Sequence, residues 1–178
     1  HRQVQTSSLL PKDSDLIAEE NKDIVVAASP QYSGGGQVKY YEKNAYAPIL
    51  GATESYAPMY QYEAAQGRFL TREDVRGNAM VAALGYKVAD ELFGALPCVG
   101  KTVKINGKSF IVIGAMEEKG AYGFIELDNQ VIIPLSTAMG RMFGQRYLNM
   151  LVVQCASAAR VPTCIERVKK TLRASHQI

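Results

Sequence analysis

Few side chains in this sequence are of the types, and in the places, that catalysis requires. The chain holds two histidines, His1 and His176, and both lie near its ends. A Ser-His or Cys-His dyad would need one of them to be ordered and internal, which terminal residues seldom are. No HExxH, GxSxG, P-loop or EF-hand pattern occurs in the sequence. We therefore predict a domain with no catalytic residues.

Carboxylates leave two alternatives open. The adjacent pair Glu117 and Glu118 invites an acid–base hypothesis, but neighbouring carboxylates on an exposed turn are usually only solvated. Catalysis by carboxylates alone stays possible in principle, because sequence cannot place four others in space: Glu54, Glu63, Asp74 and Glu126.

Three cysteines, Cys98, Cys155 and Cys164, fit no zinc-ribbon or CxxC spacing, so we expect no metal site. Cys155 and Cys164 flank a short loop and could form a disulfide in an oxidising compartment. The alternative is two small buried or half-buried side chains. The odd number of cysteines leaves Cys98 free in either case.

Two further motifs raise the question of a ligand. The glycine triplet at 34–36 could cradle a phosphate, but no Lys-Ser/Thr pair follows it and no helix opens there, so we predict a flexible turn. Tyr56, Tyr60 and Tyr62 could form a stacking platform for sugars or bases, although packing of their rings is the favoured interpretation. We predict no cofactor.

The composition is that of a folded globular protein of 178 residues, with 47% hydrophobic and 21% charged residues. The formal charge of +3 is mild and the basic residues are scattered, so we expect no nucleic-acid partner. No apolar run approaches the ~18 residues needed to span a bilayer, and no secretory signal is visible. The start at His1 rather than Met indicates an excised fragment, which we expect to be soluble.

Hydrophobic patterning predicts a mixture of helices and strands. We expect a helix at 10–21 and strands at 24–28, 37–41, 46–50 and 80–85, the last leading through Gly85 into a helix ended by Gly94. This strand–glycine–helix order resembles half of a nucleotide-binding unit, but it has one glycine where the fingerprint needs three. Further strands are predicted at 131–134 and 150–154, and Ser136 is predicted to cap a helix that runs to Gly144.

The clearest local feature is a β-hairpin over 101–113. Asn106 and Gly107 can both adopt positive φ, as a two-residue hairpin turn requires. That turn pairs Ile105 with Lys108 and Val103 with Phe110. Ile111 and Ile113 then point to the opposite face, which predicts a strand covered on both faces.

The last predicted helix has Pro162 in its first turn and an apolar stripe beside basic residues. Such a helix can lie on a membrane or bind an acidic partner, but the stripe is narrow and aliphatic, which favours docking on the domain's own sheet. The stripe is Val161, Ile165, Val168 and Leu172, and the basic residues that we expect to face solvent are Arg167, Lys169, Lys170 and Arg173.

Five segments follow one another in an ordered set. They are Gly-Arg-Phe-Leu-Thr-Arg-Glu-Asp-Val at 67–75, Val-Ala-Ala-Leu-Gly at 81–85, Val-Ala-Asp-Glu-Leu-Phe-Gly at 88–94, Val-Gly-Lys-Thr-Val at 99–103 and Phe-Ile-Val-Ile-Gly at 110–114. With the flanking helices and strands, this set resembles the periplasmic core domain of MacB-type (FtsX-like) ABC-transporter permeases over nearly the whole chain. Residues 95–98, Ala-Leu-Pro-Cys, depart from relatives that carry an acidic residue and Pro before Val-Gly-Lys. Thr71 with Glu73 and Asp74 suits an N-cap and first helical turn, so we interpret the charged stretch as architecture.

The resemblance implies an α+β fold of two mixed α/β subdomains. A porter-like subdomain would comprise residues 1–53 and 149–178, and an inserted Sabre-like subdomain residues 54–148. It also implies an extracytoplasmic (periplasmic) domain of an inner-membrane protein, looped out between the first two membrane helices. The parent would be an ABC transporter, coupled through its membrane part to an ATPase, and homodimeric.

The implied function is mechanical and non-catalytic: the domain would transmit ATP-driven conformational change to the export or release of a drug, peptide or lipoprotein. A periplasmic membrane-fusion protein is the implied partner. The alternative is a protein-binding or regulatory module of an FtsX- or lipoprotein-release-type permease. Either needs an exposed contact patch, for which the loop with Gly120, Tyr122 and Phe124 is the candidate. An extracytoplasmic hydrolase is disfavoured by the two terminal histidines.

Overall fold

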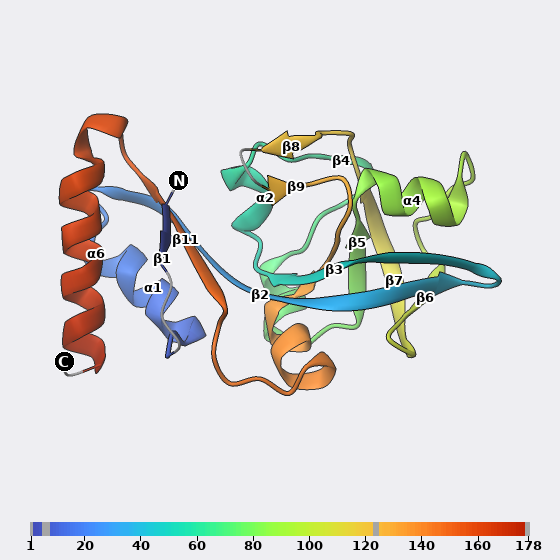
Figure 1. Cartoon of the computed structure of the whole chain (residues 1–178), viewed down its shortest axis with the longest axis horizontal. Helices are drawn as coiled ribbons and strands as arrows, with labels where there is room; N and C mark the ends of the chain where they lie inside the picture. Colours follow the sequence, from blue (N-terminus) through green and yellow to red (C-terminus); the bar gives the residue numbers. More distant parts are fainter. Residues whose placement is uncertain (1, 5–7, 123–124, 177–178) are drawn as a thin grey trace. The chain divides into compact units, whose positions relative to one another are not determined.

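The computed structural model (Figure 1) describes residues 2–4, 8–122 and 125–176. Its chain divides into two compact units. Unit 1 comprises His1–Gln31 and Arg146–Ile178, and unit 2 comprises Tyr32–Gln145. Both units mix helices and strands, as the α+β prediction requires. No helix in the described part of the chain is long and apolar enough to cross a bilayer.

Unit 1 is a three-stranded antiparallel sheet with two helices that pack against each other (Figure 1). The strand order is β1–β11–β2, so the two ends of the chain meet in one sheet. The elements are β1 (Arg2–Val4), α1 (Pro11–Glu20), the first part of β2 (Val25–Tyr40), β11 (Met150–Cys155), the 3-10 helix η2 (Ala158–Arg160) and α6 (Val161–His176).

A disulfide joins the end of β11 to the first turn of α6. Cys155 and Cys164 are bonded, with their Cα atoms 6.2 Å apart, and Cys98 is a free, buried thiol. Of the two readings of this pair left open by the sequence, the disulfide is the one found. Burial raises the pKa of the Cys98 thiol, so it stays protonated and inert.

Helix α6 docks on its own unit through Val168 of the predicted stripe and through two residues that each precede a stripe residue, Cys164 and Thr171. Cys164, Val168 and Thr171 are buried, whereas Ile165 and Leu172 are only half-buried. Asn21 at the end of α1 donates its side-chain amide to Thr171 Oγ1 at 3.1 Å, which ties the two helices together. This face of α6 therefore docks within its own unit, with α1 as a packing partner.

His176 is ordered, contrary to the expectation for a terminal residue. Its Nε2 lies 3.0 Å from Oδ2 of Asp13, and its Nδ1 lies 3.4 Å from Ser8 Oγ. Asp13 is fully buried and also accepts hydrogen bonds from Leu10 N and Ser175 Oγ, so it acts as a cap of α1 and an anchor for the end of α6. These bonds hold the two ends of the described chain together.

Unit 2 contains a closed ring of strand pairings. Following the hydrogen-bonded ladders gives β2–β3–β10–β5–β7–β6 and back to β2, with β4 added beside β7. The β10–β3 and β5–β7 pairs are parallel and the others are antiparallel. The ring strands are β3 (Lys43–Ala52), β5 (Val81–Leu84), β6 (Thr102–Ile105), β7 (Lys108–Met116) and β10 (Val131–Pro134), and β4 is Ala64–Gly67.

The core of unit 2 lies on one face of this ring. Ile105, Phe110 and Ile133 are at most 1% exposed, and Leu92 and Phe93 of α4 (Tyr86–Phe93) pack against them. Shorter elements complete the unit: α2 (Tyr56–Met59), α3 (Arg72–Arg76), β8 (Ala121–Tyr122), β9 (Ile125–Glu126), α5 (Leu135–Thr137) and the π-helix η1 (Ala138–Met142).

The predicted β6–β7 hairpin is confirmed. Asn106 and Gly107 have φ of 48° and 84°, and Val103 pairs with Phe110 and Ile105 with Lys108. The prediction that β7 is covered on both faces is confirmed at Ile113, which is buried, and is wrong at Ile111, which is 51% exposed.

The predicted turn at the glycine triplet is wrong, because residues 34–36 lie inside the sixteen-residue strand β2. They pair continuously with β3, Gly34 opposite Ile49 and Gly36 opposite Ala47. A Cβ on Gly34 would sit 2.4 Å from the Phe143 ring, and one on Gly36 would sit 2.3 Å from Ile49. The glycines therefore admit close neighbours and do not bend the chain.

Ser136 lies inside the helical segment rather than at its N-cap. The helix begins at Leu135 after Pro134, and Ser136 Oγ instead hydrogen-bonds to the carbonyl oxygen of Val75. Pro134, the last residue of β10, occupies the N-cap position itself, so Ser136 falls in the first helical turn.

The two compact units meet along the chain at 31/32 and 145/146, whereas the division expected from the sequence falls at 53/54 and 148/149. The reason is β2, whose first part pairs with β11 and whose second part pairs with β3. The chain leaves unit 1 within a strand, which composition and turn signals do not mark.

Candidate partner-contact site

The candidate contact loop is a short β-hairpin. Ala121 pairs with Glu126 and Tyr122 with Ile125, which makes a two-stranded ribbon of β8 and β9. Gly120 enters the ribbon with φ of +75°, a conformation that favours glycine. Of the three predicted contact residues, Phe124 lies outside the described residues, and for Tyr122 the structure describes only the backbone.

Asp128 fixes the base of this hairpin. The residue is 3% exposed, and its carboxylate accepts hydrogen bonds from Lys119 N at 2.8 Å and Gly120 N at 2.9 Å. The backbone N of Leu127 donates to Gly120 O at 3.2 Å, directly across the base. A buried carboxylate is stable when backbone amides satisfy it, so the hairpin leaves the unit from a defined point.

The approach to the hairpin is tied to the segment before β4. Lys119 Nζ donates to Gln61 O at 2.9 Å, and Glu117 N donates to Glu63 O at 2.9 Å. Glu63 N lies 3.3 Å from Glu117 Oε1 and donates back to it. Glu117 therefore has a structural role, because its backbone and its carboxylate both bond the backbone of Glu63. This role favours a structural interpretation of Glu117 over the acid–base hypothesis.

A buried tyrosine cluster supports the other side. Tyr56, Tyr60 and Tyr62 are each at most 3% exposed, and the Tyr56 ring centroid lies 5.0 Å from that of Tyr60. Tyr62 OH donates to Leu127 O at 2.8 Å. Burial raises the pKa of Tyr56 and of Tyr62, so both phenols stay protonated. Packing, the favoured interpretation, is confirmed.

A shallow hollow of about 610 Å³ lies beside this cluster. One of its lining residues is Gln61, whose backbone oxygen accepts the hydrogen bond from Lys119 Nζ. Its lining is mainly apolar and includes two glutamates, Glu54 and Glu63. The full set is Glu54, Ala57, Pro58, Gln61, Tyr62, Glu63, Ala64, Phe69 and Leu70.

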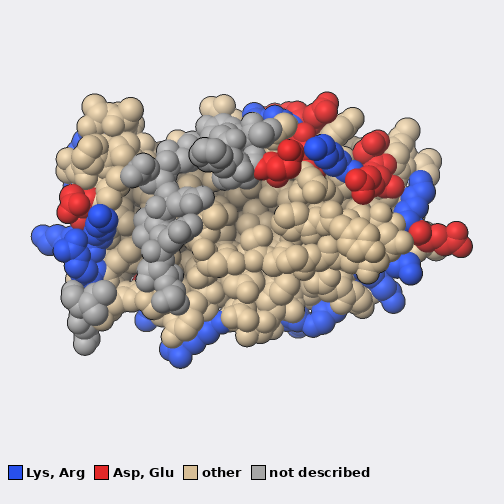
Figure 2. Space-filling model, in the orientation of Figure 1, with Lys and Arg blue, Asp and Glu red and all other residues tan. Residues whose placement is uncertain are grey.

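The surroundings of the hairpin are acidic. Glu63, Glu118 and Glu126 are exposed, and Figure 2 shows acidic side chains along the margin of unit 2 where β8 and α4 lie. Lys87 is 3.9 Å from Glu126 and offsets part of this charge. No group of three or more His, Cys, Asp or Glu side chains within the described residues could hold a metal ion.

The remaining carboxylate singled out from sequence, Asp74, is a helix cap. Thr71 Oγ1 accepts from Asp74 N, and Asp74 Oδ2 accepts from Thr71 N at 2.8 Å, the predicted cap of α3. Arg68 Nη1 lies 2.8 Å from the same oxygen. Partial burial opposes ionisation, but the hydrogen bonds from Arg68 and Thr71 outweigh it, and the pKa of Asp74 lies below its ordinary value.

Sequence reasoning missed Asp128, the residue that organises the site. It stands between two predicted segments and reads as an ordinary loop carboxylate. The signal in the sequence was Gly120, eight residues before Asp128. A glycine turn leaves backbone N–H groups without partners, and these can donate hydrogen bonds to a nearby carboxylate.

The fold and this site define a class: a two-unit α+β domain with both ends in one unit and a surface hairpin on the other. Two solved structures share the fold. The periplasmic region of MacB from Actinobacillus actinomycetemcomitans matches with a TM-score of 0.82 at 21% identity, covering 98% of this chain and 76% of that one. The extracellular domain of the noncanonic ABC-type transporter YknZ from Gram-positive bacteria matches with a TM-score of 0.81 at 20% identity, covering 96% and 85%.

The sequence profile of the MacB-like periplasmic core domain matches residues 3–171, and the chain belongs to that family. It is 34% identical to the macrolide export ATP-binding/permease protein MacB of Bdellovibrio bacteriovorus, over 84% of this chain and 23% of that protein. It is 31% identical to the pyoverdine export ATP-binding/permease protein PvdT of Pseudomonas aeruginosa, over 83% and 22%. The chain therefore spans about a quarter of the length of these relatives. Family membership makes it an extracytoplasmic domain of an ABC-transporter permease.

Proposed function

We propose that this chain is a non-catalytic coupling domain that passes ATP-driven movement of a membrane-bound permease to the export or release of a substrate outside the cytoplasm. The observation that carries the proposal is the tying of both chain ends in unit 1. β1 and β11 pair, and Asp13 and Asn21 of the first helical segment bond His176 and Thr171 of the last. Movement applied at either end reaches one cross-linked unit.

In this proposal unit 1 is the porter-like subdomain and unit 2 the Sabre-like one. Relatives such as MacB and PvdT are named as export ATP-binding/permease proteins, which supports an ATPase partner reached through a membrane part. A homodimeric parent follows the same analogy. The proposed substrate is a drug, a peptide or a lipoprotein.

The partner-facing element in this proposal is the β8–β9 hairpin, with Gly120, Tyr122 and Phe124 as contact residues. The base of this hairpin is fixed by the hydrogen bonds that Asp128 accepts from the amides of Lys119 and Gly120, which supports a contact element that leaves unit 2 from a defined point. A periplasmic membrane-fusion protein is the proposed partner. The regulatory alternative uses the same hairpin to activate another protein instead.

The test of the coupling role uses the isolated chain and the sequence of the parent gene. The isolated chain is expected to show no ATPase activity and no tight nucleotide binding, and detection of either contradicts the proposal. In the parent gene we expect an apolar run of ~20 residues shortly before His1 and three after Ile178. A cleavable signal before His1 with a stop codon after Ile178 would overturn the transporter assignment.

The hairpin has its own test. Tyr122→Ser with Phe124→Ser in the full transporter is expected to reduce co-purification of the membrane-fusion protein at least tenfold while ATPase activity in detergent persists. Tyr86→Ser on α4, 40% exposed and on the same unit, is the matched control and is expected to leave co-purification unchanged. Undiminished co-purification by the double variant removes the hairpin from the contact.

A further inference from the structure

Two lysines are neighbours on adjacent strands, on the solvent-facing side of the unit 2 ring. Lys39 on β2 is directly opposite Lys104 on β6, and both are exposed. Like charges at opposite positions of an antiparallel pair destabilise a sheet. Among the described residues, no carboxylate oxygen lies within 4.0 Å of either ammonium group or of nearby Lys101. The repulsion is therefore uncompensated within the described chain.

The two lysines belong to a polar row that crosses four strands. Asn44 on β3 pairs with Lys39, and Ser109 on β7 pairs with Lys104. In the next row, Gln37 donates its amide to Asn44 Oδ1 at 2.7 Å and to Tyr46 OH at 3.4 Å. This network fixes amide and hydroxyl groups on the open face of the sheet.

Aromatic rings lie on the same face and beside it. Tyr46 is 72% exposed and Tyr41 is 81% exposed. The Tyr40 ring packs 4.2 Å from Phe93, and the Tyr41 ring stands edge-on to Tyr40 at 4.8 Å. Tyr41 has φ of 52° because it is the first residue of the two-residue turn between β2 and β3, where hairpin turns favour positive φ. This turn holds the aromatic ring out in water.

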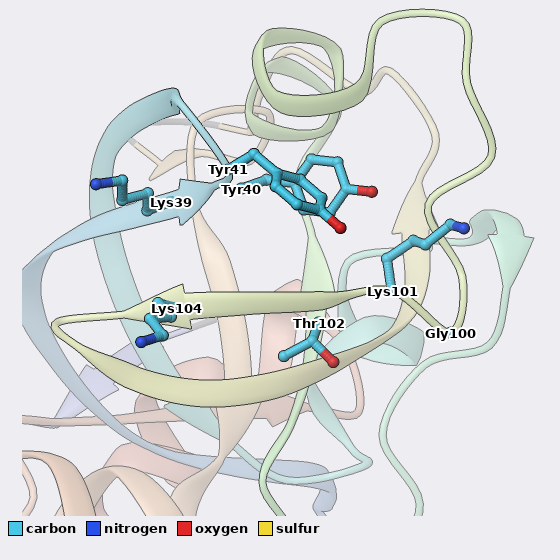
Figure 3. Close-up of a pocket in the computed structure, with 7 residues that line it drawn as sticks. All are labelled: Lys39, Tyr40, Tyr41, Gly100, Lys101, Thr102 and Lys104. Carbon is cyan, nitrogen blue, oxygen red and sulfur yellow. The ribbon is translucent and has the colours of Figure 1, made fainter.

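A hollow of about 540 Å³ is lined by four of these residues, Lys39, Lys104, Tyr40 and Tyr41, together with Gly100, Lys101 and Thr102 (Figure 3). Lys39 and Lys104 extend to one side, Lys101 lies on the other, and the rings of Tyr40 and Tyr41 lie between them. The cations are thus separated by an aromatic patch and do not converge on one point. This spacing fits an elongated ligand with anionic groups at intervals and an apolar ring surface between them.

We propose that this face of unit 2, defined by Gln37, Lys39, Tyr41, Asn44, Tyr46 and Lys104, binds a carbohydrate that carries carboxylate or phosphate groups. Lysine ammonium groups pair with the anions, fixed amides and hydroxyls meet the sugar hydroxyls, and tyrosine rings cover the apolar faces of the sugar rings. An extracytoplasmic domain meets such chains at the cell envelope. A nucleic acid shares anions and rings, but the formal charge of +3 is weak for that ligand.

The test is an NMR titration of the isotope-labelled 178-residue chain with trigalacturonate at low salt. The expected result is saturable shifts at the amides of 37–46 and 101–109. Maltotriose, the neutral control, and inorganic pyrophosphate, the anion without a sugar, are expected to bind at least tenfold more weakly. Equal binding of pyrophosphate or of a short oligonucleotide overturns the carbohydrate assignment, and so does the absence of saturable binding.

The double variant Lys39→Gln/Lys104→Gln separates binding from folding. It is expected to lose about tenfold in affinity for trigalacturonate while its melting temperature rises by about 1–3 °C, because the facing charges are gone. Lys12→Gln/Lys22→Gln removes the same charge from unit 1 and is expected to change neither. Tyr41→Asn tolerates the positive φ and is expected to weaken binding alone.

Two results would overturn the assignment of these residues. One is unchanged affinity in the lysine double variant. The other is a concentration-dependent shift of the same amides without ligand, which would make this face a contact between two copies of the chain. The failure of either arm leaves the coupling function untouched, since that function rests on the ties between the chain ends in unit 1 and on the β8–β9 hairpin, and none of the residues that define this face belongs to either.

Discussion

The side chain of Asn106 hydrogen-bonds to the backbone of β2 beside Gln37, as a neighbouring strand would. Its Oδ1 accepts from Gln37 N at 2.9 Å, its Nδ2 donates to Gly35 O at 3.3 Å, and its backbone N donates to Gln37 O at 2.9 Å. This edge of β2 pairs with β11 up to Gln31 and with β6 from Val38. Asn106 therefore supplies hydrogen bonds to the backbone of β2 in the stretch between its pairing with β11 and its pairing with β6.

Replacing Asn106 tests this role. Asn106→Gly keeps the positive φ but loses both side-chain bonds, so we expect a loss of about 1–2 kcal/mol in the free energy of unfolding. Asn106→Asp keeps the acceptor for Gln37 N and is expected to lose less. Urea denaturation measures both. A glycine variant as stable as the wild type would show that solvent replaces these bonds at no cost.

Gly34 and Gly35 form a matched pair for the packing of β2. Gly34→Ala places a methyl group 2.4 Å from the Phe143 ring, and we expect a loss of about 1–3 kcal/mol from overpacking. Gly35→Ala meets nothing within 4 Å and is expected to be neutral or to stabilise by about 0.5 kcal/mol. Thermal unfolding of the two variants compares them. Equal losses would assign the effect to the backbone instead of Phe143.

The Cys155–Cys164 bond is expected to stabilise unit 1. For cysteines nine residues apart, the chain-entropy account gives about 2–3 kcal/mol, which reduction removes. Melting with and without dithiothreitol measures the difference. Cys155→Ser/Cys164→Ser is expected to melt at the temperature of the reduced wild type and to ignore the reductant. A double variant that still responds to the reductant would show that the difference does not come from this disulfide.

Asp74 makes stability depend on pH in a stated direction. Because its folded pKa is lowered, its contribution is fully present above its unfolded pKa and is lost as the pH falls through the folded pKa. Arg68→Gln is expected to raise the pKa of Asp74 towards its ordinary value, seen by NMR titration of the carboxyl carbon. Since Arg68 is half exposed, the stability lost at pH 7 should be under about 1 kcal/mol. An unmoved Asp74 pKa would leave the Thr71 cap as the sole cause.

Local chemistry made part of the fold predictable. The Asn106–Gly107 turn and its register follow from two residues, and the Thr71–Asp74 cap follows from four. The resemblance, which rests on the order of such local signals, identified the family before the structure.

Non-local contacts decided the parts that sequence left open or got wrong. The glycines at 34–36 look like a turn until Phe143 and Ile49 are placed against them. Asp128 becomes recognisable only when the amides of Lys119 and Gly120 are brought to it by the fold. The facing of Lys39 and Lys104 depends on a register between strands far apart in sequence.

The closed ring of unit 2 bears on how the domain withstands mechanical load. A strand of an open sheet can peel from its edge one ladder at a time, whereas each strand of the ring is held by a neighbour on either side. Detaching any one of them breaks two ladders at once and exposes the shared core. We expect the amides of these strands to exchange with solvent in a single cooperative opening. Under tension, unit 2 should therefore yield as one block instead of unravelling strand by strand.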